Sequence, residues 1–391
     1  MVPFTTPIPA LTETKAKLTY YPALTGIRAV AAIMVSFFHV ALEIAPRGHQ
    51  GLLLKLLAKF MLQWHIGVAI FFVLSGFLIT TRYADRVEPS LTWAKRYMQN
   101  RFARIYPVYF LLTVFSFCIM LWHPFNAWCE WPQTYKVPEK IFVFFLNLTL
   151  TRSYFEDLYM IGLPTAWSLT VEETFYICAP IMLLGLKRDL RRIIGYPIII
   201  GLLGCVLVIL CSKFIPLYGL MSNLRFMMNL TFFGRSAEFI FGMGLALWVA
   251  RKPDYTSHRL VYTTAGIIGL ITFMCIVAIA HFFYPVAVPA DWSYAQILAN
   301  NFLLPIIICI LFWGIISERT VLRQVLETHI FDLLGKSSYV LYLIHLGAFD
   351  IIFRQYVSSN HTIRLVTYIL ISIIIYKTIE HPLHKKLRAK S

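Results

Sequence analysis

The first apolar stretch of the chain carries two side chains that could do chemistry. Arg28 lies near its start, and His39 follows after ten intervening residues, roughly 16 Å further along a helix. Imidazoles exchange protons near neutral pH, so His39 is the first candidate for a general base acting on a hydroxyl. The alternative is a packing histidine bonded to a backbone carbonyl. Ser36, one turn earlier, does not by spacing alone indicate a covalent nucleophile.

A second cluster could hold an anion. Arg101 and Arg104 are three residues apart, which places both guanidinium groups on one face of a helix. Each guanidinium forks toward anionic oxygens, so the pair predicts a phosphate clamp to which Arg28 could add. The pair could equally be a membrane anchor that touches lipid phosphates.

Carboxylates occur where lipid should be. Glu172 and Glu173 follow shortly after the predicted start of a spanning helix at 166. On the predicted topology Glu172 lies at the depth of His39 and could hold its imidazole. The alternative partner for Glu172 is Arg235, which precedes Glu238 by three residues.

His345 is a second-rank base candidate, with Tyr339 and Tyr342 on its helical face. The seven cysteines contain no CxxC pair, and most lie in apolar runs, where cysteine is a small hydrophobe. The sequence therefore predicts neither a disulfide framework nor a metal site.

The elements that must position these residues are membrane helices. The chain has 391 residues, of which 59% are hydrophobic and 14% charged, far from a soluble mixture. Stretches of about 20 apolar residues can span a bilayer as helices. The pattern predicts an all-α protein with ten spans near 22–42, 61–81, 104–122, 166–186, 193–213, 231–250, 260–281, 295–316, 335–354 and 362–380.

Basic loops orient these spans. The segment after the second span is the densest in arginine and lysine, so the positive-inside rule places it, and both termini, in the cytoplasm. The alternation holds if 141–150 does not cross and is instead an outer re-entrant or interfacial segment. Membrane orientation thus explains the net charge of +16 without nucleic acid. The expected organisation is a cytoplasmic segment 1–21, a membrane domain 22–380 and a basic cytoplasmic tail 381–391.

Taken together, these segments resemble acyltransferase family 3, membrane O-acyltransferases that modify bacterial O-antigen, exopolysaccharide and related glycans. The matching motifs, in chain order, are Leu24-Thr25-Gly26-Ile27-Arg28 leading to His39, Gly67 to Ile79, Arg101-Phe102-Ala103-Arg104-Ile105-Tyr106-Pro107, Trp167 to Tyr176, Arg235 with Glu238, Gly335 to His345, and Ile379-Glu380-His381-Pro382. One departure is Ala69, where the family usually has an acidic residue.

The resemblance implies ten helices with both termini cytoplasmic, in a bacterial inner membrane. It implies acetyl-CoA or another acyl-CoA as the donor and a glycan, free or lipid-linked, as the acceptor. The family's arginine and histidine pair carries over to Arg28 and His39, and its RxxR motif to Arg101 and Arg104. No appended esterase-like domain is seen, so acceptor transfer is expected to be completed by this domain or by a partner protein.

The functional hypothesis is direct acyl transfer with His39 as base, Glu172 and Arg28 assisting, and Arg101, Arg104 and Arg28 binding the donor. Relay of the acyl group through an acyl-enzyme is the alternative. Substrate binding is expected from Trp167, Ser168, Arg235, Glu238 and His345. A proton-coupled transporter is the rival hypothesis, because buried Arg, His and Glu could line a path. A scaffold without chemistry is a third. The sequence predicts membrane lipids as neighbours and does not predict an oligomeric state.

Overall fold

The computed structural model describes residues 20–44, 52–122, 129–252, 260–283 and 293–389. Within these ranges the fold is all-helical, with one isolated bridge between Phe155 and Leu220. The α-helices are α1 (Pro22–Ile44), α2 (Leu52–Met61), α3 (Gly67–Tyr83), α4 (Leu91–Trp122), α5 (Val137–Leu148), α6 (Trp167–Arg188), α7 (Arg192–Phe214), α8 (Leu224–Leu230), α9 (Phe232–Ala250), α10 (Val261–Phe283), α11 (Tyr294–Leu298), α12 (Leu304–Ser317), α13 (Val321–Leu326), α14 (His329–Ile344), α15 (Ala348–Tyr356), α16 (His361–Ile375) and α17 (His381–Leu387).

In the described part of the chain, nine helical stretches are long and apolar enough to cross a membrane. They coincide with nine of the ten predicted spans. The prediction of one helix over 335–354 is wrong. Helix α14 ends at Ile344 and α15 begins at Ala348, because Gly347 has a φ of 90°, a conformation that side chains rarely allow. His345 therefore lies at the end of a helix.

Residues 137–166, named here the α5 segment, fold back along α4. Helix α5 has 12 residues, too short to span alone, which agrees with the prediction that 141–150 does not cross. The Tyr109 hydroxyl of α4 donates to the Asn147 carbonyl at 2.6 Å. Buried Arg152 donates to Asn147 Oδ1 at 2.8 Å and to the carbonyls of Ile161 and Leu163. These bonds hold the segment together, and α6 begins directly after it.

Helices α3 and α9 form a close contact in the centre of the bundle. A Cβ added to Gly76 would overlap the Phe239 carbonyl, and one added to Gly242 would overlap the Val73 carbonyl. Small residues at such a crossing let two backbones touch, which is the usual way that membrane helices pack tightly. The crossing fixes Ser75 of α3 beside the functional site.

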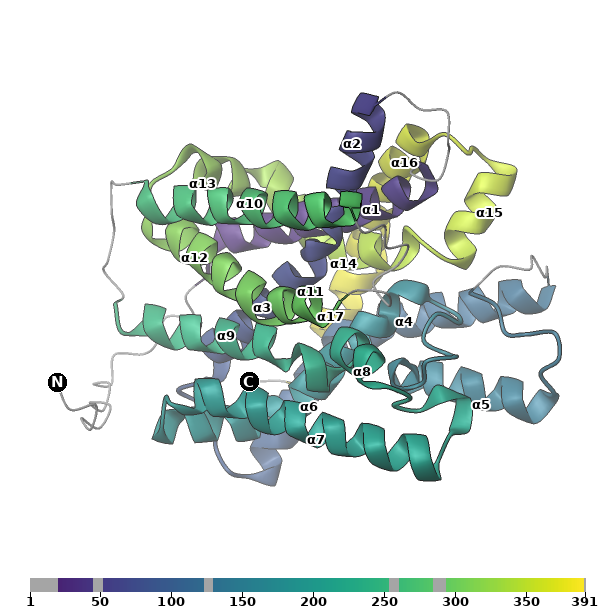
Figure 1. The fold of residues 1–391 in the computed structure, drawn as a ribbon, viewed down its shortest axis with the longest axis horizontal. Coiled ribbons are helices and arrows are strands. Elements are labelled where there is room, and N and C mark those ends of the chain that lie inside the picture. Colours follow the sequence, from purple (N-terminus) through teal and green to yellow (C-terminus); the bar gives the residue numbers. More distant parts are fainter. Residues whose placement is uncertain (1–19, 45–51, 123–128, 253–259, 284–292, 390–391) are drawn as a thin grey trace.

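Helices α7 and α10 lie at the periphery. Figure 1 shows α7 along the lower edge of the bundle and α10 along the upper edge. Only 11% of the most apolar window of α7 and 22% of that of α10 are buried within the protein. Their remaining apolar side chains are suited to contact lipid.

Candidate active site

A cavity of about 450 Å³ opens between α1, α3, α4, α6 and α14. This volume lies within the range of roughly 300–1,000 Å³ that is typical of small-molecule sites. Arg28, Arg101 and Arg104 line it together, as the RxxR motif and the first helix predicted. The other arginine, lysine, histidine and carboxylate side chains in its lining are Arg82, Lys336, His384 and Glu172. The cavity is therefore strongly basic.

The two arginines of the RxxR motif have different partners. Arg104 forms an ion pair with buried Glu380, with Nη1 2.5 Å from Oε1. Arg101 lies between aromatic rings, 5.7 Å from the centroids of both Tyr83 and Tyr176, and no acidic side chain pairs with it in the described ranges. Cation–π contacts hold a guanidinium while leaving N–H groups for an anion. Of the two arginines, Arg101 is thus better placed to donate hydrogen bonds to a phosphate.

Glu172 lines the same cavity. Its Oε1 accepts hydrogen bonds from the hydroxyls of Ser75 and Tyr176. Arg28, whose Nε is 3.5 Å from Ser338 Oγ, lines the cavity with it. This carboxylate balances part of the positive charge of the three arginines and is held rigidly by two donors.

The structure does not bring Glu172 to His39. The described side chains around Glu172 are those of the cavity, and Arg235 does not pair with it either. The expectation of equal depth is wrong for a physical reason: the α5 segment folds back along α4, so α6 starts inside the bundle. Glu172 consequently lies at the level of Arg28, eleven positions before His39 on α1.

The partner of His39 is His345. His39 Nδ1 lies 3.1 Å from His345 Nε2 and 2.9 Å from the carbonyl oxygen of Val35. His345 Nδ1 lies 3.2 Å from the Leu341 carbonyl oxygen. Both rings are thus anchored to the carbonyls of their own helices, and the pair joins α1 to the end of α14.

These contacts assign the tautomers. A carbonyl oxygen can only accept, so both rings carry a proton on Nδ1 when neutral. The one His39 Nδ1–H is then shared between the Val35 carbonyl and His345 Nε2, and His39 Nε2 keeps its lone pair. A histidine held in this way can take a proton at Nε2, while its neighbour supports the Nδ1–H bond.

The side chains of Ser168 and Tyr342 form a partition between the cavity and the histidine pair. The Tyr342 hydroxyl and Ser168 Oγ are 2.8 Å apart, and both residues are buried. The Tyr342 ring lies 5.8 Å from the rings of Phe71 and of His345. Ser168, a predicted substrate-binding residue, and Tyr342 thus lie about one helical turn from the cavity wall formed by Glu172 and Tyr339.

Arg235 and Glu238 do not line the cavity. Glu238 receives two hydrogen bonds from Arg235, both 2.7 Å long, and both side chains are buried. The guanidinium lies 5.3 Å from the Phe72 ring centroid and 6.0 Å from that of Trp167. A bidentate pair under two aromatic rings braces α9 against α3 and α6. A direct substrate contact from Arg235, Glu238 or Trp167 stays a prediction.

Sequence reasoning did not assign roles to Ser75, Tyr176 and Glu380. Tyr176 follows Glu172 by four residues, a spacing that places both on one helix face, so this contact could have been predicted. Glu380 stands in the Ile379-Glu380-His381-Pro382 motif, but nothing local connects it with Arg104. Among the described residues, no group of three or more His, Cys, Asp or Glu side chains could hold a metal ion.

The fold and site define a class: an α-helical, multi-pass integral membrane protein with a basic cavity and a histidine pair inside its bundle. Comparison with known families specifies it further. The acyltransferase domain model of family 3 matches residues 21–376, so the chain belongs to this family. The chain thus carries a membrane acyltransferase domain of this family, and the family assignment favours an enzyme over a transporter. No solved structure matches.

Three relatives have O-acetyltransferase in their names. The O-acetyltransferase OatA of Staphylococcus aureus strain NCTC 8325 is 24% identical over 389 residues, covering 94% of this chain and 58% of the relative. The peptidoglycan O-acetyltransferase OatA of Listeria monocytogenes is 30% identical over 209 residues, covering 49% of this chain and 29% of the relative. A protein of S. aureus strain COL, provisionally named an O-acetyltransferase, is 24% identical with 95% and 58% coverage. The chain thus covers 58% of the length of each S. aureus relative, which is under two thirds.

Proposed function

We propose that the chain transfers an acetyl group from acetyl-CoA, bound at the basic cavity, to a hydroxyl of a cell-surface glycan. The observation that carries this proposal is the convergence of Arg28, Arg101 and Arg104 on one cavity. Three guanidinium groups this close repel each other unless an anion lies between them. A donor with several phosphates supplies that anion.

The orientation follows the positive-inside rule, with the basic cavity facing the cytoplasm, where acetyl-CoA is made. The phosphates contact Arg101 and Arg104, and Arg104 shares its guanidinium between the donor and Glu380. Arg28 and Glu172 lie at the inner end of the cavity, so the pantetheine arm points toward the partition of Ser168 and Tyr342. The membrane is a bacterial inner membrane, as in the family's known members.

In the chemical step, His39 Nε2 takes the proton of the acceptor hydroxyl as its oxygen attacks the thioester carbonyl. The new C–O bond forms, the C–S bond breaks, and the leaving thiolate takes the proton back from the imidazolium. His345 Nε2 supports the cation by accepting the hydrogen bond from His39 Nδ1–H. Direct transfer requires that Tyr342 moves away from Ser168, since their contact lies between the cavity and His39.

The acceptor is a polysaccharide hydroxyl. The family resemblance indicates a glycan such as lipopolysaccharide O-antigen, whereas the Listeria relative is named for peptidoglycan. The two acceptors share the chemistry of a sugar hydroxyl, which is what a histidine base requires.

The test is transfer of radiolabelled acetyl from acetyl-CoA by the purified protein in nanodiscs. O-antigen oligosaccharide and peptidoglycan fragments are offered in parallel reactions. Label in either glycan, dependent on His39, supports the proposal and names the acceptor. Binding of acetyl-CoA without label in any glycan would overturn the acceptor assignment, and absence of binding would overturn the donor assignment.

A further inference from the structure

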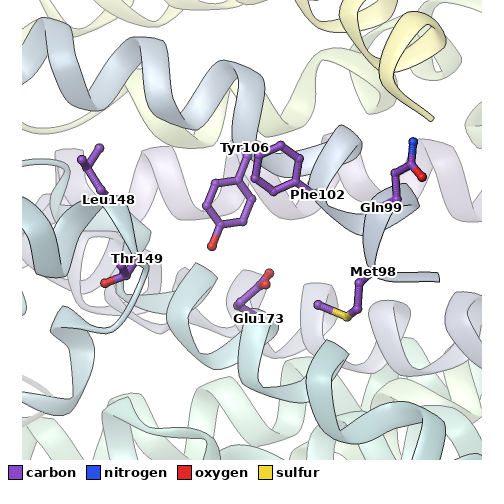
Figure 2. Close-up of a pocket in the computed structure, with 7 residues that line it drawn as sticks. All are labelled: Met98, Gln99, Phe102, Tyr106, Leu148, Thr149 and Glu173. Atoms are coloured by element: carbon purple, nitrogen blue, oxygen red, sulfur yellow. The ribbon is translucent and has the colours of Figure 1, made fainter. Parts of the chain in front are cut away.

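A second hollow lies on the other face of α4. It is a groove of about 520 Å³, open on one side, between α4, α6 and the end of α5 (Figure 2). Phe102 and Tyr106 of α4 line the groove, whereas Arg101 and Arg104 line the cavity described above. The other lining residues are Met98, Gln99, Leu148, Thr149 and Glu173. The α4 and α6 pair therefore separates two sites.

The side chain of Glu173 adds a polar group to the mostly apolar lining of the groove. Figure 2 shows its carboxylate pointing into the groove between Tyr106 and Met98. Its Oε2 is buried and has no hydrogen-bond partner among the described residues. A buried carboxyl oxygen without a partner is costly, even on a side chain that is only partly buried, and native proteins seldom leave one so. The occupant of the groove should therefore be apolar along most of its length and polar at Glu173.

The outer surface of α4 continues the groove toward a positive charge. Lys95, Gln99, Phe102 and Tyr106 have the spacing i, i+4, i+7 and i+11, so they form one stripe along the helix. Lys95 is exposed and forms no ion pair with any described residue. The stripe thus runs from a cation through an amide to two aromatic rings. This order matches a molecule with a phosphate head and a hydrocarbon tail.

We propose that this groove binds a bilayer phospholipid. Its phosphate contacts Lys95, its ester carbonyls accept hydrogen bonds from the Gln99 amide and from the protonated Glu173 carboxyl, and one acyl chain follows Phe102 and Tyr106 to Leu148. The groove opens to the side of the bundle, where phospholipid is the surrounding solvent, and Phe102 is 52% exposed there. Because α4 and α6 also carry Arg101 and Glu172, a bound lipid braces the wall of the donor cavity.

The first experiment measures bound lipid by native mass spectrometry after purification in mild detergent. Lys95→Ala is compared with Arg96→Ala, an exposed neighbour that lies off the stripe. We expect about fivefold lower phospholipid retention for Lys95→Ala, the effect of one basic residue on an anionic lipid, and unchanged retention for Arg96→Ala. Equal retention in both variants would overturn the assignment of the phosphate contact.

The second experiment tests the tail and the carboxyl. A phosphatidylglycerol with a diazirine on its acyl chain is incorporated into vesicles with the protein and photolysed. Crosslinks should fall on Met98, Phe102 and Leu148 and should decrease in Phe102→Ala but not in Leu111→Ala, a lipid-exposed control on α4. Glu173→Gln tests the polar contact with little change in shape.

Three results would overturn the proposal: crosslinks spread evenly over the lipid-facing helices, no phospholipid on the purified wild type, or a polyprenyl phosphate in its place. The last result would instead identify a lipid-linked glycan carrier. Lipid retention is measured without acetyl-CoA, so this inference can fail while the proposed function stands. Only the effect of the bound lipid on the donor cavity rests on the proposed function. That effect predicts weaker acetyl-CoA binding in Lys95→Ala than in Arg96→Ala.

Discussion

The basic cavity and the histidine pair differ in charge and in exposure to solvent. The cavity gathers arginines around one carboxylate and stays open, with 27% of the Arg104 side chain exposed. The histidine pair is held by backbone carbonyls, and His345 is only 4% exposed. In the proposed function, charge therefore serves donor binding, and a neutral histidine tautomer serves proton transfer. The comparison implies that substitutions in the two regions should separate donor affinity from turnover.

Replacing His39 should give the largest effect. His39→Ala removes the proton acceptor, and we expect transfer to fall about 10²- to 10⁴-fold with acetyl-CoA binding unchanged. The measurement is labelled acetyl transfer together with calorimetric donor binding. His329→Ala, an exposed histidine at the opposite end of α14, is the control. Normal turnover in His39→Ala would remove it from the mechanism.

Replacing Arg101 should act on binding. Arg101→Ala deletes charge-assisted hydrogen bonds to phosphate, and we expect the KM for acetyl-CoA to rise about 10- to 100-fold with a smaller change in kcat. Arg188→Ala, an exposed arginine at the end of α6, is the control. A loss confined to kcat would contradict the separation of the two regions.

Arg104 needs a matched variant, because its removal leaves Glu380 buried without its cation. Arg104→Ala should therefore lower both stability and donor affinity. Adding Glu380→Gln should restore thermal stability in detergent but not affinity. Recovery of both would show that Arg104 serves the fold alone.

His345 should affect turnover less than His39. His345→Ala removes one of the two acceptors of the His39 Nδ1–H and leaves the Val35 carbonyl, and we expect kcat to fall about tenfold with KM unchanged. His345→Gln, which keeps a side-chain acceptor, should recover part of the loss. An equal loss in both variants would favour packing over positioning.

Tyr342 should give the smallest effect. Tyr342→Phe loses the hydrogen bond to Ser168, so the partition opens more readily. We expect acetyl-CoA hydrolysis without acceptor to rise roughly two- to tenfold, the size of one net hydrogen bond. The rate of hydrolysis is measured from the free thiol that thioester cleavage releases. A decrease would mean that the hydroxyl contributes to the reaction.

Local patterns predicted much of this fold. The length of apolar stretches located nine spans, and the spacing of Arg101 and Arg104 predicted that they lie on one helix face, where both line a cavity with Arg28. The break after His345 was missed because hydropathy carries no signal for the positive φ of Gly347. The His39 and His345 contact was missed because it joins residues 306 positions apart.

The depth of Glu172 was missed for a related reason. Counting residues from a predicted helix start assumes that the start lies at the membrane surface. The α5 segment breaks this assumption by entering the bundle before α6 begins. The conformation of this segment depends on Arg152, which donates hydrogen bonds to the carbonyls of Ile161 and Leu163. These contacts follow from the path of the loop and not from a helical spacing that could be seen in the sequence.

The glycine crossing of α3 and α9 has an evolutionary consequence. Because the two backbones touch at Gly76 and Gly242, any larger residue at either position must move Ser75 and with it the cavity wall. Helices α7 and α10 bury little of their surface, so most of their positions carry no such constraint, and the close contact of Gly266 with Leu311 is confined to the side of α10 that faces α12. Among related chains we therefore expect substitutions to accumulate on α7 and α10, while selection removes variants at the crossing.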